Sequence, residues 1–191
     1  MNNCFKRLKL IFFIIFVSCA KDKDVITIID QKDIDLQMID SYKKGLKALE
    51  AGDALFAAKQ FNEAELLYPQ SPWAAKSAIM AAYAYYSQSY YGDAIFELER
   101  YLVAYPNHED KVYAYFLLGM SYYEQIVDEK KDLKTIEESK KQFELIIKKY
   151  PTSEFAIDAD FKIDLINEIL AAKEMYIARY YLKKTKWIPA L

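Results

Sequence analysis

Cysteine and histidine are scarce in this sequence of 191 residues, and their scarcity excludes several kinds of site. Cys4 and Cys19 are the only cysteines, and His108 is the only histidine. A disulfide framework needs several paired cysteines, and a structural zinc site needs about four Cys or His ligands. We therefore expect no metal ion and no cofactor, and stability must come from packing.

Glycine and proline are also few, with four and five residues respectively. Two of the glycines lie in Gly52-Asp53 and Gly92-Asp93, which we expect to be turns between paired helices. Ala, Leu, Lys and Glu are abundant instead, and these residues favour helices. Hydrophobic residues make up 53% of the chain and charged residues 28%, which is typical of a globular rather than a disordered protein. The composition predicts an all-α fold with short connections.

The sequence has no apolar run of the roughly 20 residues that a transmembrane helix needs. The run Leu10–Val17 would rise only about 12 Å as a helix, and it follows three basic residues within residues 6–9. This order is typical of an export signal. We predict a lipoprotein signal peptide over residues 1–18 and a lipid-anchored polar tether over residues 19–35.

The predicted cleavage site, Phe16-Val17-Ser18-Cys19, resembles the bacterial lipobox. In that motif an apolar residue and a small residue precede a cysteine that is acylated before cleavage. The resemblance implies diacylglycerol and an N-acyl chain on Cys19, with Phe16 standing where leucine is usual. By resemblance to lipoprotein sorting in enteric bacteria, Ala20 rather than aspartate after Cys19 implies the outer membrane, on its periplasmic side. Ordinary signal cleavage beside a free thiol is the alternative.

The charge balance indicates the class of partner. The formal net charge is −2, and removing residues 1–18 takes away three positive charges and leaves about −5. Nucleic acids and anionic lipid surfaces attract basic proteins, so neither is expected as a partner. We expect protein partners and, through Cys19, attachment to a membrane.

One short motif occurs three times and divides the rest of the chain into repeats. Each copy contains a Tyr-Pro pair that ends a helix, because proline clashes with the carbonyl group four residues back. A polar residue shortly after each proline is expected to cap the next helix. The copies are Tyr68-Pro69-Gln70-Ser71, Tyr105-Pro106-Asn107-His108 and Tyr150-Pro151-Thr152-Ser153, and the capping residues are Ser71, Asn107 and Ser153.

The same apolar face precedes each proline at identical offsets. This arrangement resembles the second helix of the tetratricopeptide repeat (TPR), in which small residues let paired helices approach and large residues fill the space between hairpins. The faces are Ala57, Phe61 and Ala64; Ala94, Leu98 and Tyr101; and Ser139, Phe143 and Ile146. Gly45 and the series Tyr115, Leu118, Gly119 and Tyr122 match the first helix of the same repeat.

The resemblance implies an all-α TPR solenoid of antiparallel helix hairpins over residues 36–191. Three repeats are complete, and the third has eight extra residues, which we expect in a polar loop at Val127–Lys134. After Pro151, helical spacing predicts one long helix to about Lys184. A fourth repeat begins inside this helix and lacks its second helix, so we expect a C-terminally truncated form of a longer protein.

A lipobox, a polar tether, Tyr-Pro repeats and the segment Ala171–Lys184 together resemble the BamD family of outer-membrane assembly lipoproteins. Members of that family carry five repeats and bind the periplasmic domains of the β-barrel insertase, companion lipoproteins and nascent outer-membrane proteins. The resemblance implies a non-enzymatic periplasmic scaffold of the β-barrel assembly (BAM) complex, which helps to insert β-barrel proteins into the outer membrane. The alternative is a TPR lipoprotein of another envelope system, namely a cell-division (Tol–Pal) coordinator or a secretin pilot.

No group of residues has the spacing of a catalytic site, so we expect no enzymatic activity. His108 lies in an inter-repeat turn, where helix capping or solvent exposure is favoured over acid–base chemistry. Asp158, Asp160 and Asp164 are more typical of a solvated helix face than of a cation site. A helical periplasmic hydrolase is the competing function of a different class, and it lacks candidate residues.

Tyrosine is abundant, with 17 residues, which is more than the repeat pattern needs. Several aromatic residues have the inner-face spacing of the first helices in the second and third repeats. Our hypothesis is that they line a groove for an extended or β-hairpin segment that ends in an aromatic residue. Packing between repeats is the alternative. The predicted groove residues are Tyr83, Tyr86, Tyr113, Phe116 and Tyr123.

Overall fold

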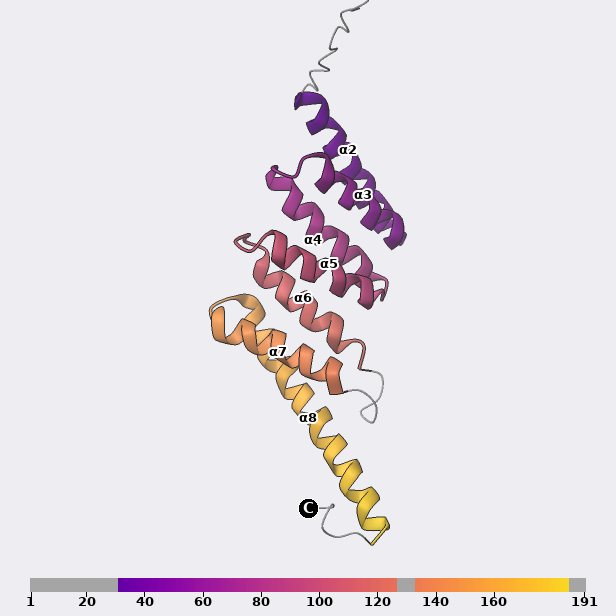
Figure 1. The fold of residues 1–191 in the computed structure, drawn as a ribbon, viewed down its shortest axis with the longest axis vertical. Helices are drawn as coiled ribbons and strands as arrows, with labels where there is room; N and C mark the ends of the chain where they lie inside the picture. Colours follow the sequence, from indigo (N-terminus) through magenta and orange to yellow (C-terminus); the bar gives the residue numbers. More distant parts are fainter. Residues whose placement is uncertain (1–30, 127–132, 186–191) are drawn as a thin grey trace, which may run out of the picture. The chain divides into compact units, whose positions relative to one another are not determined.

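The computed structural model describes residues 31–126 and 133–185, and these residues fold into seven helices with no strand among them. The helices are α2 (Gln31–Glu50), α3 (Ala54–Leu67), α4 (Pro72–Ser87), α5 (Tyr91–Ala104), α6 (Lys111–Tyr123), α7 (Leu133–Lys149) and α8 (Glu154–Lys183). Each helix packs on the next one along the chain, and α6 also contacts α8 (Figure 1). The all-α prediction is confirmed.

The helices form antiparallel hairpins that stack in sequence order. We call α2, α4, α6 and α8 the first helices and α3, α5 and α7 the second helices. The long helix α8 ends at Lys183, as its spacing predicted. Helix α2 begins at Gln31, inside the stretch that we predicted to be a tether. None of the helices in the described part is long and apolar enough to cross a membrane.

Two of the sequence predictions lie wholly or mostly outside the described residues. These are the signal peptide with Cys19, within residues 1–30, and most of the polar loop at Val127–Lys134. The last two residues of that loop are helical, because α7 begins at Leu133.

The Tyr-Pro pairs end the second helices as predicted. Tyr68 and Tyr105 lie at the C-caps of α3 and α5, and α7 ends one residue before Tyr150. The hydroxyl group of Ser71 accepts a hydrogen bond of 3.1 Å from the backbone N–H of Trp73, so it caps α4. Proline in the first turn stabilises this start further, because its missing N–H would have no partner there.

The capping predictions for Asn107 and Ser153 are wrong. Helix α6 begins only at Lys111, because two successive turns follow Tyr105: His108 donates its N–H to Tyr105, and Lys111 donates to His108, each at 3.2 Å. Asp110 therefore takes the N-cap position. Ser153 does lie at the N-cap of α8, but its side chain makes no capping hydrogen bond.

One predicted glycine turn is confirmed and the other is displaced. Gly52 has a φ of 78°, which only glycine adopts without strain, and Asp53 caps α3 by accepting a hydrogen bond of 3.0 Å from Phe56. Gly92, however, lies inside α5. The turn between α4 and α5 comes earlier, at Ser89, which has a φ of 64°. There Tyr90 donates its N–H to Tyr85, so the helix ends with a Schellman-type turn that contains serine instead of glycine.

All nine residues of the predicted apolar faces are fully buried. The tightest contacts join second-helix rings to first-helix glycines. A methyl group built on Gly45 would lie 2.8 Å from the Phe61 ring, and one built on Gly119 would lie 2.8 Å from the Phe143 ring. Glycine at these positions lets the ring lie directly against the helix backbone, so the two glycines set the closeness of the first and third hairpins.

Replacing either of these glycines with alanine is expected to destabilise the protein. Gly45→Ala or Gly119→Ala forces the facing ring out of its position, and such overpacking costs about 1–3 kcal/mol in the free energy of unfolding. Gly92→Ala is the matched control, because nothing lies within 4 Å of its added methyl group. Urea denaturation of the three variants measures the difference. Equal midpoints for all three would contradict the close-contact account.

Candidate protein-binding site

The predicted groove residues lie on two neighbouring first helices. Tyr83 and Tyr86 belong to α4, and Tyr113 belongs to α6. Burial, together with the nearby hydroxyl groups of Tyr83 and Tyr86, raises the pKa of Tyr113 to about 12. Tyr86 and Tyr113 both pack against one buried cluster, whereas Tyr83 keeps 37% of its surface exposed. The structure therefore brings these three tyrosines together, with Tyr83 outermost.

Phe116 and Tyr113 form an aromatic group with a residue that the groove prediction did not include. The ring of Phe155, at the start of α8, lies 5.3 Å from that of Phe116 and 5.6 Å from that of Tyr113. Phe116 also contacts the buried ring of Phe143 at 5.8 Å. These tilted ring contacts join α6 to α7 and α8. Phe116 thus contributes to packing between the repeats.

Tyr123 lies at the other end of α6 and faces a cation. The ammonium group of Lys162, on α8, lies 4.5 Å from the centre of the Tyr123 ring, which is a cation–π distance. Tyr123 is half-buried. The five predicted residues therefore follow the contacts of α4 with α6 and of α6 with α8. Phe155 and Lys162 extend this set, which we call the aromatic row.

An apolar pocket of about 260 Å³ lies beside the first hairpin, and the sequence analysis missed it. The ring of Tyr42, on α2, lies 5.3 Å from the ring of Phe61 and 5.3 Å from the ring of Trp73, measured between ring centres. The Tyr42–Trp73 contact joins α2 to α4 beside the pocket. Trp73 keeps 43% of its surface exposed, and Lys76 lies 5.2 Å from its ring. In the sequence, the signal for this pocket was the tryptophan that directly follows Pro72. The lining residues are Met38, Ile39, Tyr42, Lys43, Leu46 and Trp73.

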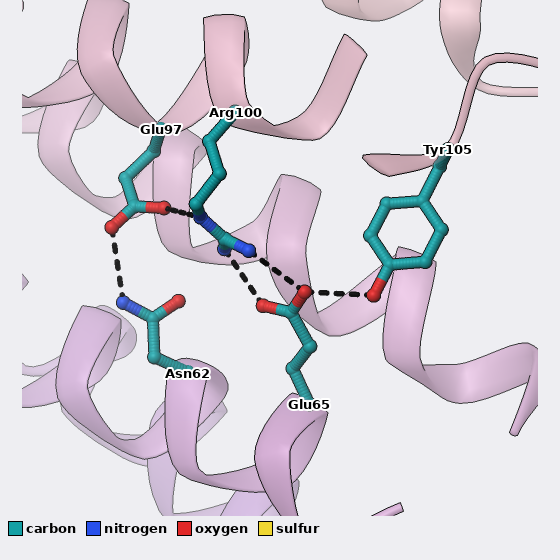
Figure 2. A network of polar contacts seen from close by, with 5 residues as sticks. All are labelled: Asn62, Glu65, Glu97, Arg100 and Tyr105. Carbon is teal, nitrogen blue, oxygen red and sulfur yellow. Dashed lines mark hydrogen bonds and ion pairs between the residues drawn. The ribbon is translucent and has the colours of Figure 1, made fainter. Parts of the chain in front are cut away.

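A polar network joins α3 to α5, which are the second helices of the first and second repeats (Figure 2). The guanidinium group of Arg100, on α5, donates two hydrogen bonds of 2.8 and 2.7 Å to Glu65 on α3. A third, of 2.8 Å, goes to Glu97. Tyr105 donates its hydroxyl to Glu65 at 2.7 Å, and Asn62 donates to Glu97 at 3.1 Å. We call these five residues the α3–α5 network.

The α3–α5 network is largely shielded from water. The side chains of Glu65 and Glu97 are only 9% and 11% exposed, while that of Arg100 is 36% exposed. The hydrogen bonds to Glu65, opposed by burial, raise the pKa of Arg100 above its ordinary value. Burial, together with the hydrogen bond to Glu65, also raises the pKa of Tyr105. Sequence reasoning missed this network; a charged residue directly after the buried Ala64 was its only local signal.

His108 is neither a helix cap nor a freely exposed side chain. Its Nδ1 atom accepts hydrogen bonds from the Tyr101 hydroxyl at 3.0 Å and from the backbone N–H of Asp110 at 3.3 Å. Tyr101 is fully buried, and burial raises the pKa of its hydroxyl group. The histidine therefore provides an acceptor for a buried tyrosine, which is a structural task.

The described residues offer no arrangement typical of a metal site. Asp158, Asp160 and Asp164 are all exposed on α8, as predicted. Within residues 31–126 and 133–185, no three His, Cys, Asp or Glu residues are placed to hold a metal ion together. What the structure presents is an apolar pocket and a row of aromatic rings on stacked repeats, and surfaces of this kind bind protein segments.

The sequence matches a known family over most of its length. The family model described as YfiO, outer membrane lipoprotein, covers residues 34–191. This chain belongs to that family. The match begins three residues after the start of α2, so it covers nearly all of the helical part.

Curated relatives carry the name outer membrane protein assembly factor BamD. The protein from Caulobacter vibrioides is 36% identical over 150 residues, which are 78% of this chain and 49% of the relative. The protein from Rickettsia prowazekii is 34% identical over 162 residues, which are 85% of this chain and 64% of the relative. The chain therefore spans between about half and two thirds of the length of these relatives. Family membership therefore groups this chain with relatives that carry the name of an outer membrane protein assembly factor.

A solved structure supports the fold. The first TPR domain of the human RPAP3 protein superposes with a TM-score of 0.53 over 72% of this chain and 95% of that domain, at 20% sequence identity. At this identity the likeness shows the fold alone. It confirms the TPR solenoid that the repeated Tyr-Pro motif predicted.

The buried position of Tyr113 predicts a loss of stability at alkaline pH. Its pKa rises from 10.0 in the unfolded chain to about 12 in the fold. The tyrosine thus contributes stability that is fully present below pH 10 and is lost as the pH rises to about 12. Tyr113→Phe is expected to reduce this loss in urea unfolding across that range. Tyr90→Phe is the control, because Tyr90 is 44% exposed. If Tyr90→Phe reduced the alkaline loss of stability as much as Tyr113→Phe does, the assignment of this loss to Tyr113 would be contradicted.

Proposed function

We propose that this protein is a non-enzymatic scaffold of the outer-membrane β-barrel assembly machinery. Membership of the outer membrane lipoprotein family, with curated relatives named as assembly factors, is the observation that carries the proposal. The same names favour this function over a cell-division or secretin-pilot lipoprotein. The stacked repeats supply what a scaffold needs, because neighbouring hairpins present continuous surfaces to other proteins.

The proposed location is the periplasmic face of the outer membrane, with acyl chains on Cys19 as the anchor. Three chains exceed the two-signal condition for stable membrane attachment. The lipobox-like sequence before Cys19 supports this proposal, and that part of the chain lies outside the described residues. The proposed partners are the periplasmic domains of a β-barrel insertase, companion lipoproteins and segments of nascent outer-membrane proteins.

The aromatic row is the proposed contact for a nascent segment. Tyr83 is its most accessible tyrosine, whereas Phe116 is held between Phe143 and Phe155. An extended or β-hairpin segment with a terminal aromatic residue suits this surface, because exposed ring edges pack well against another ring. A substitution of Tyr83 is therefore expected to change binding without changing the fold. Phe116 contributes both to the proposed binding surface and to the packing of the repeats.

Cross-linking in intact cells followed by mass spectrometry tests the proposed scaffold role. We expect cross-links to an outer-membrane β-barrel insertase and acyl chains on the peptide that begins at Cys19. Cys19→Ala is expected to abolish acylation and to release the protein from the membrane fraction. An acylated protein cross-linked only to Tol–Pal or secretin subunits would overturn the proposed machinery and leave the anchor intact.

A binding measurement tests the aromatic row separately. Tyr83→Ala is expected to weaken binding of a peptide from the C-terminus of a β-barrel protein, since truncating an exposed aromatic anchor removes ring contacts. Tyr90→Ala is the matched control, because Tyr90 is similarly exposed, at 44%, but precedes the second helix α5. Fluorescence anisotropy with a labelled peptide gives both dissociation constants. Unchanged binding by Tyr83→Ala and Tyr123→Ala would disprove the groove.

A further inference from the structure

The α3–α5 network is a directional connection between the first and second repeats. Glu65 receives two parallel hydrogen bonds from Arg100, so the carboxylate and guanidinium planes fix each other's orientation as well as their distance. Glu97 holds the same guanidinium group from its own helix and is held in turn by Asn62 on α3. Tyr105 adds a bond from the end of α5. Rotation of one repeat against the other would break several of these bonds at once.

The positions of Glu65 and Arg100 carry apolar residues at the next junction, whereas the positions of Asn62 and Glu97 carry Glu99 and Gln142. Glu65 lies four residues before its repeat's proline, and the residue four before Pro106 is Leu102. Arg100 lies six residues before Pro106, and the residue six before Pro151 is Leu145. Leucine cannot form the ion pair, so the second and third repeats cannot be joined by the bidentate bond that joins the first two.

These two kinds of junction resist motion differently. The second junction has a packed core across α4, α5 and α6 and a hydrogen bond of 3.2 Å from Tyr122 to Glu99, but it lacks the equivalent bidentate ion pair. Turning the partners of a shielded bidentate pair apart leaves their charges uncompensated, whereas apolar contact is non-directional. The carboxylates here are about one-tenth exposed, so separating Arg100 from them leaves charge that water reaches poorly. The first junction is therefore the stiffer one on physical grounds.

We propose that the α3–α5 network locks the first two repeats into one rigid block, and that the repeats bend at the junction between the second and third. The apolar pocket between α2 and α4 lies within the rigid block. Tyr83 and Tyr86 on α4 lie near Tyr113 on α6 across the flexible junction, so bending changes the spacing of the aromatic row. This inference concerns the mechanics of the repeats and does not depend on the proposed function.

Spin-label distances at equivalent positions test the inference. Lys59, Phe96 and Lys141 each lie ten residues before the proline of their repeat, and all three are exposed. In the full chain with Cys4→Ser and Cys19→Ser, cysteine pairs at 59/96 and 96/141 report the two junctions by double electron–electron resonance. The 59/96 distance distribution is expected to be the narrower. Equal widths, or a narrower 96/141 distribution, would overturn the proposal.

Two variants show whether the network is the cause. Glu65→Leu with Arg100→Leu copies the leucines of the second junction, and replacing both partners of an ion pair with apolar residues usually preserves folding. This variant is expected to broaden the 59/96 distribution until it matches 96/141. The reverse exchange, Leu102→Glu with Leu145→Arg, is expected to narrow the 96/141 distribution. Circular dichroism verifies the helical content, and a folded Glu65→Leu/Arg100→Leu variant with an unchanged 59/96 width would disprove the role of the network.

Discussion

The contact of an aromatic ring with a bare helix backbone is the constraint on which the repeats depend. Phe61 lies against Gly45 and Phe143 against Gly119, at a distance that leaves no room for even a methyl group on either glycine. Each contact fixes how closely one hairpin closes and which side chains face outward. A single hairpin cannot cover both of its apolar sides, so the next hairpin must pack against it. The stacked order of α2 to α8 follows from this requirement.

The sequence predicted those parts of the fold that depend on local sterics. Proline beyond the first turn ends a helix, and a small–large–small face at constant spacing has to be buried. The helix ends before Pro69, Pro106 and Pro151 and all three faces were therefore predictable. The failures are turns whose geometry several residues decide together. The turn before α5 is made by Ser89 in a left-handed conformation that its sequence does not favour, which left Gly92 free to be helical.

The candidate binding site was predictable where it follows from repeat register, and not where it follows from the angle between repeats. Tyr83, Tyr86 and Tyr113 come together because equivalent faces of α4 and α6 meet. Phe155 joins them only through the way in which α8 crosses α6, and no periodicity specifies that crossing. Glu65 and Arg100 are 35 residues apart and lie on surfaces that would be solvated in isolated helices. Their burial appears only when the repeats are stacked.

The two sets of helices divide the work of the molecule. The second helices carry Phe61, Phe143 and the α3–α5 network, which determine how the repeats are placed. The first helices contribute Gly45, Gly119 and Phe116 to that placement, and they also carry Tyr83 and the exposed side of Trp73. A residue such as Tyr83 can therefore vary at small cost to the free energy of folding, because its exposed ring is not what holds α4 in position. Tyr83, the proposed contact for a partner, is thus separate from the residues that fix the packing, so the proposed contact can change while the packing of the repeats stays fixed.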